Sequence, residues 1–151
     1  MVRSTLLGGL TPRLFLKRHW QKSPYLIRDA FPGFHPPISA DQLAGLACEE
    51  NVESRLVIKT RRKPYWQVKS GPFTQADFRA LPKKHWTLLV QDTDKHVPVL
   101  AALLDHFRFI PNWRIDDLMI SYAADGGSVG PHMDAYDVFL LQAQEIGRAH
   151  V

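Results

Sequence analysis

Two apolar, strand-like segments separated by a glycine-rich turn constrain this chain more than any other feature. Residues 115–122 and 136–141 are rich in β-branched and aromatic types, which favour strands. The intervening stretch 124–131 (ADGGSVGP) holds three glycines and a proline, the residues that mark turns. The pattern predicts a β-rich fold whose last strand ends close to the end of the sequence, so that closing strands would be missing.

Short periodic runs predict the remaining elements. Strands are expected at 25–27, on both sides of a basic turn at 61–64 within 54–68, and at 86–90. Helices are expected from the N-caps Thr11, Ser39 and Thr74, and over 97–109, where leucines recur at helical spacing. No repeat or linker interrupts the chain. The predicted fold is mainly β with N-terminal helices, of the α+β class.

Composition places the chain among globular proteins. Its 151 residues suit one domain, and 45% hydrophobic against 23% charged residues can support a buried core. The sequence contains no run of about 18 apolar residues, so it predicts no membrane-spanning helix. No signal peptide is recognisable. The single cysteine, Cys48, excludes an internal disulfide framework. These features predict a cytoplasmic, single-domain protein without a membrane partner.

The charge is modestly basic. The formal net charge is +4 and the isoelectric point is about 9.4, with the densest basic stretches at 61–63 and 83–84. Nucleic-acid patches usually run to five or more basic residues, so stretches this short are more typical of a solvated surface. The charge alone identifies no partner, and we expect no direct contact with nucleic acid.

His132-Met133-Asp134 is the arrangement that best suggests chemistry. In a β-strand, residues two positions apart point to the same face, so the imidazole and the carboxylate can converge on one cation. Two of the three ligands of a facial triad for non-haem Fe(II) can be supplied in this way. The spacing alone is a weak signal, because it arises by chance about once in two chains of this length and composition. A strand-edge histidine beside a surface carboxylate stays open as the alternative.

Several blocks of sequence resemble one family. They are W-R-I-D-D-L-M-I-S-Y at 113–122, G-G at 126–127, V-G-P-H-M-D-A-Y-D-V-F at 129–139, R-H-W-Q-K-S-P at 18–24, D-Q-L-A-G-L-A at 41–47 and S-G-P-F at 70–73. The chain resembles the bacterial ribosomal oxygenases, JmjC-type members of the cupin superfamily, over nearly its whole length up to Gln144. The resemblance implies an incomplete double-stranded β-helix (cupin/JmjC jelly roll).

The resemblance also implies an activity and a site. The family consists of Fe(II)- and 2-oxoglutarate-dependent dioxygenases, and its bacterial branch hydroxylates an arginine of a large-subunit ribosomal protein. By this resemblance His132 and Asp134 would be metal ligands, and Ser121 would bind the co-substrate 2-oxoglutarate. Tyr136 and Asp137 are weaker candidates for substrate binding, and packing is an equally good interpretation of Tyr136. No catalytic side chain beyond the metal site is implied, and a homodimer is the expected assembly.

The end of the chain departs from the family pattern. The third metal ligand, a downstream histidine, and the basic residue for the far carboxylate of 2-oxoglutarate are expected beyond Gln144. The last seven residues, EIGRAHV, match one reading frame of a common sequencing-adapter oligonucleotide. We therefore expect residues 1–144 to be the N-terminal part of the oxygenase domain, 145–151 to be a non-native tail, and the chain itself to be inactive.

Two alternatives to this function stay open. The first is a non-catalytic cupin-like module that binds the ribosome or RNA through its basic surface. The second keeps the oxygenase chemistry but changes the target residue from arginine to histidine. A third histidine ligand with a nearby Arg or Lys would favour the enzyme over the module.

Overall fold

The structure, a computed structural model, describes residues 6–144. The chain divides into two compact units, one formed by residues 37–132 and the other by the described residues of 1–36 and 133–151. The tail predicted at 145–151 lies outside the described residues. Within residues 6–144, no helix has both the length and the apolar character needed to cross a membrane.

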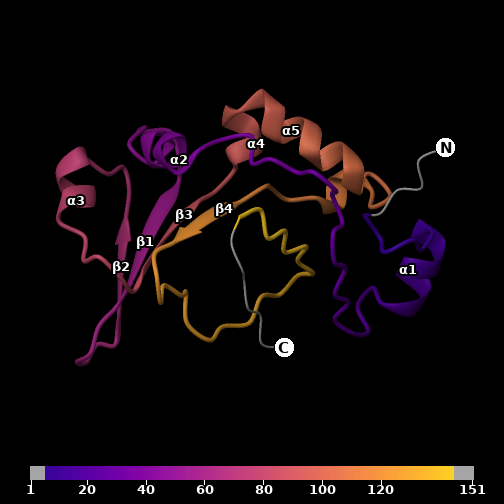
Figure 1. Ribbon diagram of the computed structural model, residues 1–151, viewed down its shortest axis with the longest axis horizontal. Coiled ribbons are helices and arrows are strands. Elements are labelled where there is room, and N and C mark those ends of the chain that lie inside the picture. The colour runs from indigo at the N-terminus through magenta and orange to yellow at the C-terminus, as the bar shows by residue number, and fades with distance from the viewer. Residues whose placement is uncertain (1–5, 145–151) are drawn as a thin grey trace. The chain divides into compact units, whose positions relative to one another are not determined.

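A four-stranded sheet is the centre of the unit formed by residues 37–132 (Figure 1). Its strands are β1 (Ser54–Lys59), β2 (Trp66–Ser70), β3 (Trp86–Val90) and β4 (Ile120–Ala123). The spatial order is β2-β1-β3-β4, and every neighbouring pair is antiparallel. The predicted pair of strands within 54–68 and the predicted strand 86–90 are thereby confirmed, the former with β2 extending to Ser70.

Short helices connect and cover these strands. They are α2 (Ala40–Leu46), α3 (Gln75–Arg79), α4 (Thr93–His96), α5 (Pro98–Leu104) and the 3-10 turns η1 (Asp105–Phe107) and η2 (Asn112–Arg114). The predicted caps are confirmed: Ser39 and Gln42 form a reciprocal capping box at α2, and Thr74 and Asp77 form one at α3. Each box satisfies backbone N–H groups that have no partner within the helix.

The two faces of the sheet have different surroundings. Leu56, Leu88 and Val90 are almost fully buried, and they pack with Leu43 and Ala47 in one hydrophobic cluster. We call this the helix face, because α2 supplies Leu43. Side chains of successive strand residues alternate between faces. Their neighbours, including Val57, Thr87, Leu89 and Ser121, therefore form the opposite face.

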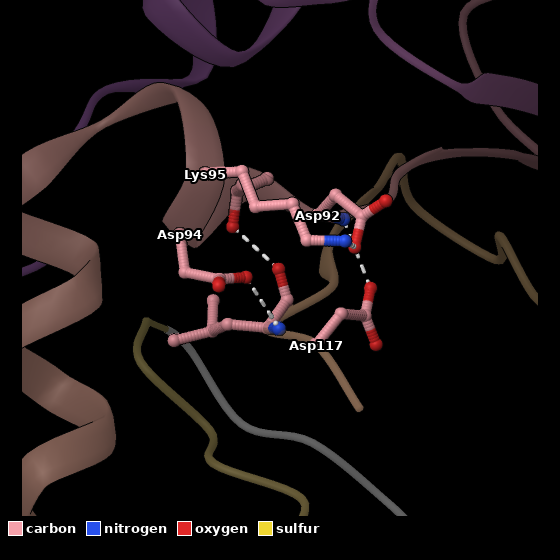
Figure 2. Close-up of polar contacts among 6 residues, drawn as sticks. Asp92, Asp94, Lys95 and Asp117 are labelled. Atoms are coloured by element: carbon pink, nitrogen blue, oxygen red, sulfur yellow. Dashed lines mark hydrogen bonds and ion pairs between the residues drawn. The ribbon is translucent and has the colours of Figure 1, made fainter. Parts of the chain in front are cut away.

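A set of hydrogen bonds fixes the segment that leads into β4 (Figure 2). The backbone N–H of Asp92 donates to the Asp117 carboxylate at 2.9 Å, and the backbone N–H of Leu118 donates to the Asp94 carboxylate at 2.8 Å. The hydroxyl and the backbone N–H of Thr93 both donate to the Leu118 carbonyl. These bonds join the end of β3 to the chain just before β4, and so set the position of that edge strand.

The other unit is organised around α1 (Pro12–Arg18). Thr11 caps this helix and Pro12 occupies its first turn, as predicted. Phe15 is 6% exposed and lies 6.0 Å, between ring centroids, from Phe139. The ring of Phe139 also stacks on Trp20 at 5.7 Å. Aromatic packing thus ties residues near 139 to the first helix.

Several predicted elements are wrong or shorter than expected. Residues 25–27 and 136–141 form no strand, and of 115–122 only 120–122 lie in a strand, β4. A strand needs a neighbour for its backbone groups, and within residues 6–144 none pairs with 136–141. The predicted helix 97–109 ends at Leu104 and continues as one 3-10 turn. Of the leucines that recur at helical spacing in this segment, only Leu100 is fully buried, at 1% exposed.

Candidate metal and co-substrate site

Ser121 lies on the face of the sheet opposite the helix face. It pairs with Leu89 of β3, and Leu89 pairs in turn with Arg55 of β1. Directly opposed residues of neighbouring antiparallel strands share a face. Arg55, Leu89 and Ser121 therefore form one row across three strands, with Ser121 exposed at the β4 edge.

Two polar groups on this face are buried without a hydrogen-bond partner among the described residues. They are the Thr87 hydroxyl, on a residue only 3% exposed, and the Arg55 Nε. Buried polar groups normally have partners, because an unpaired one costs about 1–3 kcal/mol. A guanidinium and hydroxyls on the same face as Ser121 suit a ligand that carries carboxylates. This observation fits 2-oxoglutarate to the face.

Sequence reasoning missed Arg55 and Thr87. Their shared face depends on strand pairing between distant parts of the chain, which a single sequence does not show. One local signal was present, since Thr87 is a polar residue within the apolar run of 86–90. Its 3% exposure shows that it lies inside rather than on the surface.

The glycine-rich loop that precedes His132 is anchored to the start of β3. The backbone N–H of His85 donates to the Asp125 carbonyl at 2.9 Å, and that of Ala124 donates to the Trp86 carbonyl at 3.0 Å. Lys84 forms an ion pair with the Asp125 carboxylate at 2.5 Å. This hydrogen-bonded pair raises the pKa of Lys84 and lowers the pKa of Asp125.

The same loop passes directly over Trp66. A Cβ built on Gly130 would lie 3.1 Å from Cε2 of the Trp66 ring, and Gly130 has a φ of +77°. Such a φ disfavours any residue with a side chain, and so does the short approach to the ring. Glycine at position 130 therefore lets the loop cross Trp66 two residues before His132.

His132 is exposed, and its Nδ1 lies 3.0 Å from the Gly130 carbonyl oxygen. A carbonyl only accepts, so Nδ1 carries the proton in this contact. The neutral tautomer with Nδ1 protonated has its lone pair on Nε2, the nitrogen that would coordinate a metal. A hydrogen bond from the second ring nitrogen to a backbone carbonyl is a common way of orienting a ligating histidine.

The other three predicted site residues belong to the unit that contains α1. Asp134 is exposed, and the Tyr136 side chain is 67% exposed. The Asp137 carboxylate accepts a hydrogen bond from the Gln21 amide at 3.0 Å. Tyr136 is thus an exposed side chain rather than a buried packing residue, and Asp137 is already held toward the end of α1.

The strand on which the His132–Asp134 prediction relied is absent. Neither residue is in a β-strand, and the boundary between the two units falls between His132 and Met133. Over the described range 6–144, no group of three or more His, Cys, Asp or Glu side chains could hold a metal ion. The argument that strand alternation aligns the two ligands is therefore wrong here, although their pairing as ligands stays a prediction.

Comparison with known proteins decides the family. Residues 102–148 match the JmjC domain family. The chain is 52% identical over 128 residues to the ribosomal protein uL16 3-hydroxylase of Escherichia coli, and 44% identical over 133 residues to a probable ribosomal oxygenase of Haemophilus influenzae. This chain belongs to the JmjC-type ribosomal oxygenases. The matched JmjC residues include Ser121, His132, Asp134, Tyr136 and Asp137.

Solved structures of a ribosomal oxygenase support the same assignment. YcfD of E. coli has been solved with cobalt and 2-oxoglutarate, and with cobalt and succinic acid. The two structures give TM-scores of 0.76 and 0.77 at 50% sequence identity, over 83% of this chain and 34% of YcfD. The likeness confirms the predicted fold class as part of a JmjC/cupin fold. The chain spans about a third of the length of the curated relatives it matches, 33% and 32%.

Proposed function

We propose that the protein is an Fe(II)- and 2-oxoglutarate-dependent dioxygenase that hydroxylates an arginine side chain of the large-subunit ribosomal protein uL16. The single observation that carries the proposal is the match of residues 102–148 to the JmjC domain, because that segment contains His132, Asp134 and Ser121. The name of the E. coli relative supplies uL16 as the substrate. Arginine as the target residue rests on the family resemblance.

His132 and Asp134 would hold the iron. The Gly130 carbonyl orients His132 so that Nε2 would face the metal, and the Asp134 carboxylate would add one negatively charged oxygen ligand. Bound Fe(II) with 2-oxoglutarate supplies the oxidising chemistry that inserts one atom of O2 into a substrate C–H bond. The protein's share is to hold the metal and to orient the substrate.

The face of the sheet opposite the helix face would receive 2-oxoglutarate. The Ser121 hydroxyl would donate to a carboxylate oxygen of the co-substrate. The buried Arg55 Nε and Thr87 hydroxyl, unpaired in the described part of the chain, would gain partners from the same ligand. Satisfying groups that are otherwise buried and unpaired favours binding, because their desolvation cost is already present without the ligand.

Tyr136 and Asp137 would contact the substrate. An arginine guanidinium presents a planar set of donors that a carboxylate accepts and an aromatic ring can cover. Asp137 supplies a carboxylate, and Tyr136 supplies a ring that is 67% exposed. A homodimer in the cytoplasm completes the proposal.

The proposal is tested by incubating purified uL16 with the chain, Fe(II) and 2-oxoglutarate, and with any longer product of the same gene. Mass spectrometry of uL16 peptides should show the gain of one oxygen atom on an arginine. The gain should require 2-oxoglutarate, and it should vanish in the His132→Ala variant but persist in His35→Ala. Oxygen on a histidine would contradict arginine as the target residue. No oxygen gain with either the chain or a longer gene product would contradict the proposal that the protein is an enzyme.

A non-catalytic, ribosome- or RNA-binding module is the second candidate. It is favoured by the lack of a three-residue metal group in the described range 6–144. Such a module would bind its partner without Fe(II) and would leave uL16 unmodified. The uL16 assay therefore separates the two functions.

A further inference from the structure

One short hairpin carries the whole net charge of the chain. Residues 59–66 (KTRRKPYW) form the end of β1, the connecting turn and the start of β2, and we call them the basic hairpin tip. The tip holds four basic side chains and no acidic one. The chain has nineteen basic and fifteen acidic residues, so the other residues have fifteen of each and are neutral overall.

The cations of the turn have no acidic partner among the described residues. Arg61, Arg62 and Lys63 are exposed, and no ion pair involves them. Two lysines elsewhere in the same unit are paired with carboxylates, Lys84 with Asp125 and Lys95 with Asp92. The turn projects from the sheet at the lower left of Figure 1, away from α2 and α3. Its positive potential is therefore local and accessible.

The turn is held in one conformation by its own hydrogen bonds. The Thr60 hydroxyl lies 2.6 Å from the carbonyl oxygens of both Arg62 and Pro64, and the backbone N–H of Thr60 donates to the Tyr65 carbonyl at 2.8 Å. Both strands beside the turn belong to the sheet. Ordering of the backbone before binding lowers the entropy cost of association.

Aromatic rings stand among these cations. The Tyr65 side chain is 53% exposed, which leaves much of a large, flat side chain in water. Lys59 Nζ lies 5.7 Å from the centre of the Trp66 ring, a cation–π distance. A group of cations interleaved with an exposed ring matches the two contacts that single-stranded nucleic acids need, phosphate neutralisation and base stacking.

We propose that the basic hairpin tip binds single-stranded nucleic acid. Arg61, Arg62 and Lys63 contact successive phosphates, and Tyr65 stacks on a base. An acidic protein segment is a poorer match, because its carboxylates would pair with the cations but would not stack on the exposed ring. The proposal departs from the expectation of no nucleic-acid contact, which weighed only the shortness of the basic run. It does not depend on metal or 2-oxoglutarate binding.

The test measures binding of the chain to a fluorescein-labelled, mixed-sequence, single-stranded RNA by fluorescence anisotropy over a range of salt concentrations. The triple variant Arg61→Gln/Arg62→Gln/Lys63→Gln should bind at least tenfold more weakly at low salt. It should also reduce the slope of log K against log salt by about 2, since each single-strand phosphate contact contributes about 0.7. A matched control, Arg13→Gln/Lys17→Gln/Arg28→Gln, changes the net charge equally but should leave binding within twofold of the unaltered chain.

The ring is tested separately. Tyr65→Ala should weaken binding about tenfold with an unchanged salt slope, and Tyr65→Phe should restore it, because stacking needs the ring rather than the hydroxyl. Equal losses in the hairpin triple and the control triple would overturn the proposal, because binding would then follow net charge alone. Equal binding of a duplex, or displacement by a glutamate-rich peptide as effective as by unlabelled RNA, would also overturn it.

Discussion

The backbone N–H of Asp92 donates a 2.9 Å hydrogen bond to the carboxylate of Asp117, and this bond joins two turns that are far apart in the sequence (Figure 2). Asp92 lies two residues after β3, at the start of α4, and has a φ of 52°, in the left-handed region that side chains disfavour. Asp117 lies just before β4, the strand that carries Ser121. The bond thus holds a strained turn and positions the strand that carries the proposed co-substrate residue.

Removing the Asp117 carboxylate should destabilise the protein. The Asp117→Ala variant leaves the partly buried Asp92 N–H without its acceptor, so the free energy of unfolding should fall by about 1–3 kcal/mol. Asp116→Ala is the matched control, because Asp116 is exposed and accepts no hydrogen bond that fixes this turn. Urea unfolding followed by tryptophan fluorescence measures both. Equal losses in the two variants would show that the bond to Asp92 is not what stabilises the turn.

Asp77 should make stability sensitive to acid. The side-chain and backbone hydrogen bonds from Thr74 lower the pKa of the Asp77 carboxyl in the folded protein. A lowered pKa means that the folded state favours the carboxylate. The stabilisation is therefore complete above the ordinary aspartate pKa, and it is lost as the pH falls through the lowered value.

The variant Asp77→Asn should remove this part of the pH dependence. Melting temperatures of the variant and the unaltered chain should differ most near neutral pH and converge in strong acid. A difference that persists at the acid end would contradict the assigned role of the Thr74–Asp77 capping box.

Gly130 should tolerate no side chain. In Gly130→Ala the new Cβ would meet the Trp66 ring, and the alanine backbone would have to adopt a positive φ. Gly33→Ala is a suitable control, because Gly33 has a similar φ of +69° and nothing within 4 Å of a built Cβ. The excess loss of stability in Gly130→Ala over Gly33→Ala isolates the contact with Trp66. Pairing Gly130→Ala with Trp66→Ala should relieve that excess, and failure to do so would show that the ring does not limit the loop.

Local features of the fold were predictable, and non-local ones were not. The caps at Thr11, Ser39 and Thr74 depend on residues three positions apart, and the structure confirms each. The segment 136–141 has strand composition but finds no strand partner within residues 6–144. Its Phe139 packs instead on Phe15 and Trp20, which lie far away in the sequence.

The candidate site divides in the same way. Spacing together with family resemblance predicted His132 and Asp134 from contiguous sequence, and the resemblance alone predicted Ser121. Arg55 and Thr87 reach the face of Ser121 only through the pairing of β1 with β3 and of β3 with β4. Strand pairing is a relation between distant segments, so no single segment predicts it.

Metal binding tests the central claim most directly. The chain should bind Co(II), a spectroscopic substitute for Fe(II), with absorption bands that report ligation by His132 and Asp134. His132→Ala and Asp134→Asn should each weaken binding by about tenfold or more, because losing a ligand costs at least as much as losing the residue that hydrogen-bonds to it, which costs about 10–100-fold. His35→Ala and Asp29→Asn, which alter exposed residues of the same types, should leave the spectrum and the affinity unchanged. Equal Co(II) binding by all four variants would contradict the assignment of His132 and Asp134 as the metal ligands.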